Sequence, residues 1–503
     1  MKPSSTLSCI VLAAILAGTP CTAQEKGPVS WPQFRGPGGR GVADDEARYP
    51  SRIGAAKNLL WKVALPVGQS SPCVWGDDIF LTAYIKDRNL LETICIDRRR
   101  GKVKWRRAAP AKRIERTHSI SSPAAPTPAT DGQRVYVYFG SFGLLCYDFE
   151  GKELWSLPLP MPQMRFGTAS SPIVVGERVL LNCEYPPTPF LLAVNGRTGK
   201  IAWKQERLLP SEGYATPLHR PIPGGAEIIV HTPTRLVAYD LKDGGQRWWV
   251  RIDSVGTGTP VLGDRRVFVN SWYMGGDADD RVDIPPFAGL LKKHDKDKDG
   301  KLSKAEFPRD IYLVKRAQAS GDLPGANFMA IDFFAGIDKN KDGLVDAKEW
   351  DGMLEAAGKF AGLGMKVENG LIAVAPKGQG DVTNQVAWRE KVAVPEVTSP
   401  LFYRGRVYMV KDGGIVTCID AVSGKVKYRG RLGPGGSYFS SPVAADGKIY
   451  AASRQGTVTV FAAGDALTVL SRFDLDEPIM ATPALVEGKV YLRTDSHLCA
   501  FGE

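Results

Sequence analysis

Short stretches in which polar and apolar residues alternate recur along most of the chain. One of them is Arg134-Val-Tyr-Val-Tyr138, and similar stretches begin at Arg178, Arg266, Arg406 and Lys489. Alternation with a period of two residues is typical of β-strands, whose successive side chains point to opposite faces of a sheet. The chain also contains 54 Gly and 36 Pro, which favour tight turns. The pattern therefore predicts many short strands joined by turns.

These strands belong to a repeating unit. Each unit begins with a Ser or Thr followed by Pro, and the clearest units close on Asp, Gly-Lys and Trp. The marker prolines are Pro72, Pro123, Pro172, Pro217, Pro260, Pro400, Pro442 and Pro483. Their usual spacing of about 43 residues accommodates four short strands, which is the size of one propeller blade. The sequence therefore predicts an all-β fold, an eight-bladed β-propeller.

The last unit ends at Glu503 after three strands and lacks the strand that carries the closing aromatic residue. The start of the chain supplies such a strand around Trp61. We expect this N-terminal strand to complete the last blade, because a closed ring leaves no exposed sheet edge. The residues at the closing position are Trp61, Trp105, Trp155, Trp203, Trp248, Trp388, Tyr428 and Leu470.

The N-terminus has the pattern of a secretory signal. The cation Lys2 precedes an apolar run from Leu7 to Leu16, and small residues follow up to Ala23. The run is too short for a transmembrane helix, which needs about 18 apolar residues or more. Thr19 stands where a lipid-anchored protein would need a Cys. We expect cleavage near Ala23 and a periplasmic or secreted protein without a transmembrane segment.

Between about residues 274 and 365 the strand pattern stops and two acidic loops replace it. They run from Asp295 to Glu306 and from Asp338 to Glu349, and both match the twelve-residue EF-hand template. Calcium prefers hard oxygen ligands, which such loops supply. The predicted ligands of two Ca²⁺ sites are Asp295, Asp297, Asp299, Lys301, Ser303, Glu306, Asp338, Asn340, Asp342, Leu344, Asp346 and Glu349, where Lys301 and Leu344 act through their carbonyl groups.

The residues around these ligands predict a paired module. Gly300 and Gly343 allow the sharp turn at the sixth position of each loop. Leu302 and Val345, at the eighth positions, are apolar, as expected for loops that pair back to back. Helices are expected over residues 287–294, 327–337 and 348–360. A structural role for calcium is favoured, and a regulatory role stays open.

The module interrupts the fifth unit between its second and third strands. The expected segments are a signal peptide (1–23), an N-terminal extended segment (24–56), a first propeller part (57–273), the EF-hand insertion (274–365) and a second propeller part (366–503).

The direction of the strands places this insertion. In a propeller, connections between second and third strands leave from the same face as the connections between blades. The insertion should therefore overhang a channel mouth formed by residues that precede the first strands. The candidate residues of a pocket there are His118, Arg165, Phe166, Glu212, Tyr214, Glu396, Tyr438 and Met480. Ordinary loop polarity is the alternative explanation.

The unit from Cys95 to Trp105, with Asp97 and Gly101-Lys102, resembles the PQQ-like (pyrroloquinoline quinone-like) repeat. The opening Trp31-Pro-Gln-Phe-Arg-Gly-Pro37 resembles the start of exported PQQ-like propeller proteins of planctomycete-type bacteria. The resemblance covers residues 31–273 and 366–503. It implies a propeller related in shape to quinoprotein dehydrogenases and to BamB, a scaffold of outer-membrane assembly.

The sequence lacks features that a quinone-dependent dehydrogenase of this shape would be expected to show. No two Cys are adjacent, and a Cys-x-x-Cys-His haem motif is absent. Gly-x-Ser-x-Gly, His-Glu-x-x-His and P-loop patterns are also absent. The EF-hand calcium belongs to the insertion and cannot be carried over as the metal of a quinone site. We therefore expect no PQQ and favour a non-catalytic role.

Charge and cysteine content complete the picture. The chain carries a net charge of +11, and cations crowd the segment from Arg98 to Arg116, with Glu115 nearly alone against them. This segment indicates either a solvated sheet edge or a surface for anionic polysaccharide, lipid headgroups or an acidic protein. Export argues against a nucleic-acid partner. Free buried thiols are expected at Cys73, Cys95, Cys146, Cys183, Cys418 and Cys499.

Together these observations predict an exported calcium-binding propeller that acts as a protein-interaction or ligand-binding scaffold. Its expected partner is an envelope protein or a glycan, and a role in cell-envelope or outer-membrane assembly follows from the resemblance. Two alternatives stay open: a PQQ-dependent oxidoreductase of alcohols or sugars, and a polysaccharide- or polyanion-binding module.

Overall fold

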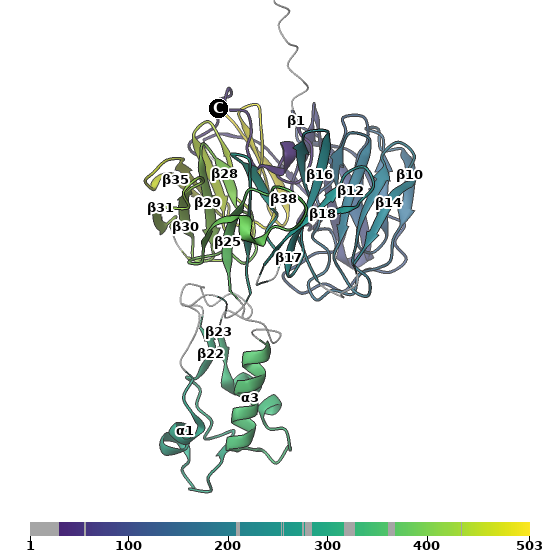
Figure 1. The fold of residues 1–503 in the computed structure, drawn as a ribbon. Helices are drawn as coiled ribbons and strands as arrows, with labels where there is room; N and C mark the ends of the chain where they lie inside the picture. The colour runs from purple at the N-terminus through teal and green to yellow at the C-terminus, as the bar shows by residue number, and fades with distance from the viewer. Residues whose placement is uncertain are drawn as a thin grey trace, which may run out of the picture.

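The computed structural model describes residues 30–54, 57–207, 212–252, 254, 256–273, 276, 284–315, 327–360, 368–433 and 435–503. Antiparallel sheets are arranged like wedges around a central axis, and a small helical unit lies beyond one face of the ring (Figure 1). The predicted signal over residues 1–23 lies outside the described part of the chain. Within that part, every helix is too short or too polar to cross a membrane.

Eight blades of four antiparallel strands surround the axis, which confirms the predicted eight-bladed propeller. Blades 1 and 2 contain β3 (Cys73–Trp75), β4 (Asp78–Ile85), β5 (Leu90–Asp97), β6 (Lys102–Ala108), β7 (Ala129–Thr130), β8 (Val135–Phe139), β9 (Gly143–Tyr147) and β10 (Glu153–Pro158). Blades 3 and 4 contain β11 (Ile173–Val175), β12 (Arg178–Cys183), β13 (Phe190–Asn195), β14 (Ile201–Glu206), β15 (Leu218–Ile222), β16 (Gly225–His231), β17 (Arg235–Asp240) and β18 (Gln246–Arg251).

The second half of the ring repeats this order. Blades 5 and 6 contain β19 (Val261–Gly263), β20 (Arg266–Ser271), β25 (Gly370–Val374), β27 (Val386–Glu390), β28 (Leu401–Tyr403), β29 (Arg406–Lys411), β30 (Ile415–Asp420) and β31 (Val426–Arg431). Blades 7 and 8 contain β32 (Val443–Ala445), β33 (Lys448–Ala452), β34 (Thr457–Ala462), β35 (Thr468–Asp474), β36 (Ala484–Val486), β37 (Lys489–Arg493), β38 (His497–Phe501) and β2 (Leu59–Ala64). A short strand, β26 (Gly380–Asp381), extends blade 4 beside β18.

The N-terminal strand β2 closes the ring. It pairs antiparallel with β38, the last strand of the chain, and places Trp61 opposite Ala500. The two ends of the propeller therefore share one sheet, and their pairing holds the ring closed. This confirms the predicted closure.

Two expectations about the register of the repeat are wrong. The first strand of blade 2 is β7, so its marker proline is Pro128 rather than Pro123, which lies in the longer connection from blade 1. In blade 7, Ser471 lies opposite Val460, eleven residues further along the chain, whereas Trp105 lies opposite Cys95 after ten residues in blade 1. Ser471, not Leu470, therefore occupies the closing position of that blade.

The closing Trp of one blade packs against the next blade. The indole N–H of Trp61 donates to the carbonyl oxygen of Arg98 at 3.0 Å. Gly101 has a φ of +67°, and a Cβ there would lie 2.6 Å from the Trp61 ring. The Gly of the repeat is therefore needed because the preceding Trp fills its side-chain space. The same packing joins Trp105 to Gly151, Trp155 to Gly199, Trp203 to Gly244 and Trp388 to Gly424.

The thiols follow the repeat as predicted. Six cysteines, from Cys73 to Cys499, are free and buried. Cys95 and Cys146 lie opposite the closing Trp of blades 1 and 2, so that they hold the same register position in different sheets. They act as small apolar side chains of the core.

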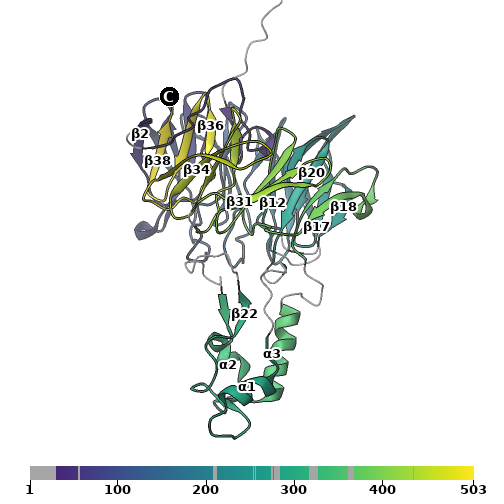
Figure 2. The same ribbon diagram turned by 90° about the vertical axis from the view of Figure 1, so that its left-hand side faces the viewer.

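The segment over residues 30–54 lies on the face of the propeller opposite the helical unit (Figures 1 and 2). Its strand β1 (Ser30–Trp31) pairs with β3 of blade 1. The guanidinium of Arg35 donates to the carbonyl oxygen of Pro400 at 2.7 Å, in blade 6. The N–H of Tyr49 donates to Asp446 at 3.1 Å, in blade 7. This segment therefore joins blades that are distant along the chain.

The helical unit lies between β20 and β25 of blade 5, as predicted. It contains α1 (Phe287–His294), β21 (Leu302–Ser303), β22 (Tyr312–Lys315), β23 (Asn327–Met329), α2 (Phe334–Ile337), β24 (Leu344–Val345) and α3 (Ala347–Phe360). The expected helix over 327–337 is wrong in its first part, because residues 327–329 pair with β22 as a strand. The unit has its own core around Phe307, Phe334 and Trp350.

Candidate functional site

The Ser or Thr that begins each unit takes part in a ring of hydrogen bonds around the axis. The backbone N–H of Ser71 donates to the hydroxyl of Thr127 at 2.9 Å, and the same bond joins each blade to the next. The N–H of Thr482 donates to the hydroxyl of Ser71 at 3.0 Å and closes the ring. The eight buried members are Ser71, Thr127, Ser171, Thr216, Thr259, Ser399, Ser441 and Thr482.

A cavity of about 230 Å³ is lined by all eight members of this hydroxyl ring. Phe34, from the N-terminal segment, also lines it. The sequence showed the repeated Ser/Thr-Pro step but gave no sign of Phe34, which is far from the repeats along the chain. Glu396 is the single acidic residue among the lining residues, and Lys and Arg are absent among them.

The structure brings half of the predicted mouth residues to this cavity: Phe166, Tyr214, Glu396 and Met480 line it. The others, His118, Arg165, Glu212 and Tyr438, are not among the lining residues. Their use by a ligand stays a prediction.

Several of the predicted mouth residues contact one another. His118 lies 5.1 Å from Phe166 between ring centroids, and the guanidinium of Arg165 lies 5.2 Å from the same ring. The hydroxyl of Tyr214 donates to Glu212 at 3.0 Å. Burial, and then the neighbouring carboxylate of Glu212, raise the pKa of Tyr214, so that this hydroxyl stays protonated. These residues form an aromatic and polar cluster beside the cavity.

The fold raises the question of whether the cavity could hold PQQ. PQQ carries three carboxylates, which need cations around them. The described lining residues supply hydroxyls, aromatic rings and one carboxylate but no Lys or Arg. These residues do not fit the cofactor.

The two acidic loops have matching internal geometry. In the first, carboxylate oxygens of Asp295, Asp297 and Asp299 lie within 4.8 Å of one another. The N–H of Gly300 donates to Asp295 at 3.1 Å, and in the second loop the N–H of Gly343 donates to Asp338 at 3.0 Å. Both glycines have positive φ, which the sharp turn of an EF-hand loop requires.

The glutamate at the twelfth position is held toward its loop in both cases. Glu306 accepts hydrogen bonds from the hydroxyl of Ser303 at 2.7 Å and the N–H of Lys296 at 3.0 Å. These bonds lower the pKa of Glu306 to about 2, so that it is ionised at neutral pH. Glu349 accepts from the N–H of Lys339 at 2.9 Å in the same way. The oxygen donors therefore fit calcium.

The loops also pair as predicted. Strands β21 and β24 place Leu302 opposite Val345, and both side chains are fully buried. The two loops therefore form one paired unit.

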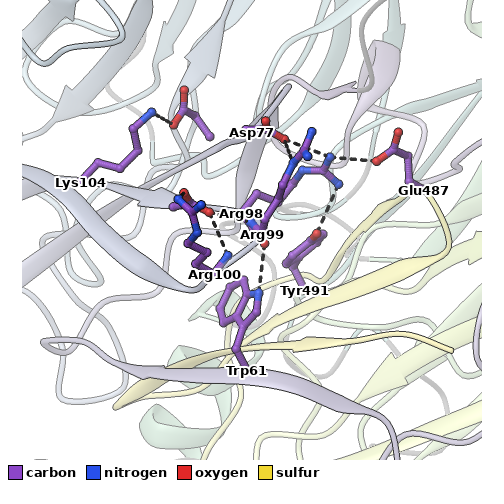
Figure 3. Close-up of polar contacts among 10 residues, drawn as sticks. Trp61, Asp77, Arg98, Arg99, Arg100, Lys104, Glu487 and Tyr491 are labelled. Carbon is purple, nitrogen blue, oxygen red and sulfur yellow. Dashed lines mark hydrogen bonds and ion pairs between the residues drawn. The ribbon is translucent and has the colours of Figure 1, made fainter.

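Carboxylates of blades 1 and 8 form ion pairs with the cationic side chains of blade 1 (Figure 3). The expectation that Glu115 stands nearly alone against it is wrong, because Glu115 is buried and accepts from Thr168 instead. The partners of the cations are Glu487 for Arg98 at 2.8 Å, Asp77 for Arg99 at 2.8 Å, Asp78 for Lys104 at 2.5 Å and Glu92 for Arg106 at 3.2 Å. This pairing reduces the charge available to a polyanion.

Comparisons with known proteins support the fold. The model of the family described as "Outer membrane protein assembly factor BamB" matches residues 51–215, 190–283 and 346–465. An EF-hand family model matches residues 288–309 and 330–354. No curated protein matches the chain.

Solved structures of low sequence identity share the propeller. BamB from Moraxella catarrhalis is 12% identical, with a TM-score of 0.50, over 88% of this chain and 97% of that one. Quinohemoprotein alcohol dehydrogenase from Comamonas testosteroni is 12% identical, with a TM-score of 0.55, over 94% of this chain and 81% of that one. A europium-containing methanol dehydrogenase is 10% identical, with a TM-score of 0.55, over 95% of this chain and 99% of that one.

These neighbours include an assembly factor and two dehydrogenases, so they establish the fold and leave the activity open. The family match, in contrast, extends over more than half of the chain. The chain therefore belongs to the BamB-like family of PQQ-repeat propellers, with an EF-hand pair inserted into its fifth blade.

Proposed function

We propose that the protein is an exported calcium-binding scaffold that binds a partner at the channel mouth and catalyses no reaction. The observation that carries the proposal is the lining of the cavity. It offers the eight hydroxyls of the ring, further hydroxyls, aromatic rings and one carboxylate, and it brings together neither a nucleophile with a base nor a pair of acids. Most of the exposed lining is apolar, and the hydroxyls are its main polar groups, which suits an uncharged group with both apolar faces and hydrogen-bond acceptors.

The hydroxyl ring gives this binding a chemical basis. Each hydroxyl oxygen of the ring accepts an N–H from the preceding blade, which leaves its own proton for another acceptor. The rings of Phe166 and Tyr214 add flat apolar surface at the cavity. A glycan, or a polar loop of an envelope protein, would match this combination of donors and aromatic faces.

We also propose that calcium binds at both loops and stabilises the fold of the paired module. The matching donor sets and the EF-hand family match support two sites. Export to the periplasm or the outside rests on the signal pattern over residues 1–23. A partner in outer-membrane assembly rests on the BamB family match.

The test is affinity capture from the native envelope with the parent and with Tyr214→Ala. Loss of the captured partner in this variant would support binding at the mouth. Trp249→Ala, on the outer strand of blade 4, is the matched control and should retain capture. Equal capture by all three proteins would contradict binding at this site.

The oxidoreductase alternative has a direct test of its own. The purified protein is incubated with PQQ and calcium and then assayed with an artificial electron acceptor on alcohols and sugars. Turnover above background would overturn the non-catalytic proposal. The polyanion alternative is checked by retention on heparin at rising salt, where the internal pairing of the cations leads us to expect elution at low salt.

A further inference from the structure

The two calcium loops differ in one contact between them. Lys301 is the seventh residue of the first loop, and its ammonium lies 2.9 Å from the carboxylate of Asp342, the fifth residue of the second loop. The seventh residue of the second loop is Leu344, whose uncharged side chain cannot form an ion pair with the first loop. The first loop therefore places a cation on a ligand of the second loop, without the reverse contact.

The pairing of the loops explains this contact. Strands β21 and β24 run antiparallel, with Ser303 opposite Leu344. This register brings the start of β21 beside the second loop. The ammonium of Lys301 donates a hydrogen bond to the carboxylate of Asp342, so that the contact is both an ion pair and a hydrogen bond.

The contact places a positive charge beside the carboxylates of the second loop, which should weaken calcium binding there. Each loop has four carboxylates among its predicted ligands, so that the loops would attract calcium equally if nothing else differed. The charge of Lys301 also acts on Asp346, a further ligand of the second loop, and less strongly on Asp299 of its own loop. Calcium that binds there must either displace the ammonium from Asp342 or share the carboxylate with it, and in both cases a positive charge stays nearby.

We propose that Lys301 is a built-in competitor of calcium at the second loop, so that the first loop fills at lower calcium concentration. This inference rests on the proposed calcium binding at both loops. The effect is moderate because Lys301 and Asp342 are about one third exposed, at 36% and 35% of their side-chain surface, and water screens the charges. A factor of roughly ten in the affinity of the second site is the expected scale.

The test is calorimetric titration of the full chain with calcium chloride. The parent should show two unequal binding events. In Lys301→Met the weaker event should become about tenfold tighter. The stronger event should change much less, because the carbonyl group of residue 301 is kept and the ammonium forms its ion pair with the second loop. Lys301→Gln should tighten the weaker event by a similar factor. It shows that the change comes from the lost charge and not from the methionine side chain. Glu306→Gln and Glu349→Gln assign each event to its loop by removing one of them.

The matched control is Lys341→Met, which removes the same charge from the fourth position of the second loop itself. This variant should change the affinity of that site much less, because among the described contacts the ion pair of Asp342 is with Lys301. Equal gains in Lys301→Met and Lys341→Met, or no gain in either, would overturn the inference. A parent that takes up no calcium would instead overturn the proposed calcium sites.

Discussion

A buried carboxyl shows how one residue can make stability depend on pH. Glu115 is only 6% exposed, and its oxygens accept from the hydroxyl and the N–H of Thr168 at 2.9 and 3.2 Å. Burial raises the pKa of Glu115 from 4.5 to about 7. The folded protein thus keeps a proton that the unfolded chain releases as pH rises. The free energy of unfolding should therefore fall between pH 4.5 and 7 on account of this group.

Glu115→Gln tests this dependence. The amide stays neutral at all pH values, so the variant should be more stable than the parent by about 3 kcal/mol at pH 8 and nearly equal to it at pH 4. Urea unfolding at the two pH values measures the difference. Glu177→Gln, at an exposed position, is the control and should change little at either pH. The same gain at both pH values would show that the effect is not a titration.

Glycines that share a backbone conformation should differ in their tolerance of a side chain. Gly101 has a φ of +67° and touches the Trp61 ring, whereas Gly76 has a φ of +56° and open space around it. Gly76→Ala should cost about 1–2 kcal/mol, which is the cost of the left-handed backbone alone. Gly101→Ala should cost clearly more, because the new methyl group also displaces Trp61. Urea unfolding of both variants measures this, and equal costs would contradict the packing argument.

At the scale of elements, the hydroxyl ring joins the blades. The hydroxyl of Ser441 accepts the N–H of Ser399 at 3.0 Å, and both residues are buried. Ser441→Ala leaves that N–H without its partner and should cost about 1–3 kcal/mol. Ser441→Thr keeps the oxygen and should be tolerated, since Thr occupies several ring positions. Urea unfolding compares them, and faster amide exchange of Ser399 in the alanine variant would locate the loss.

The alternation and the spacing of the Ser/Thr-Pro steps were enough to predict the eight blades, and the missing last strand predicted their closure by the N-terminal strand. The EF-hand template predicted the paired calcium loops. What the sequence could not decide was local register. Pro123 and Pro128 both follow a hydroxyl residue, and only pairing with β8 shows which one begins blade 2. In blade 7, Ser471 follows its partner Val460 by eleven residues, whereas Trp105 follows Cys95 by ten in blade 1, and this longer connection moved the closing position from Leu470 to Ser471. The third strand of blade 7 lacks the Cys/Ala-x-Asp frame, so the sequence did not show where the count begins.

The site was less predictable than the fold, because its residues converge from distant parts of the chain. The position before each first strand placed Tyr214 and Glu396 correctly at the cavity. It also included His118, which contacts Phe166 but is not among the residues lining the cavity. Phe34 reaches the cavity from a segment outside the repeats, so no periodicity could have indicated it.

At the scale of the whole molecule, the propeller and the insertion have separate cores. The apolar cluster around Trp350 contains residues of the insertion alone, and the blade clusters contain none of them. The two parts should therefore unfold in separate transitions, of which only one depends on calcium. For a site with a Kd of roughly 10⁻⁴ M, 1 mM calcium stabilises the insertion by about 1.4 kcal/mol.

Differential scanning calorimetry with calcium and with a chelator tests this separation. Chelation should lower the unfolding temperature of the insertion and leave the propeller transition in place. The double variant of Asp295→Ala and Asp338→Ala should respond to neither addition, because each substitution removes the first ligand of one loop. A propeller transition that falls together with that of the insertion would mean that the calcium module supports the ring. Calcium would then act on the channel mouth through the fifth blade, whose strands β20 and β25 flank the insertion.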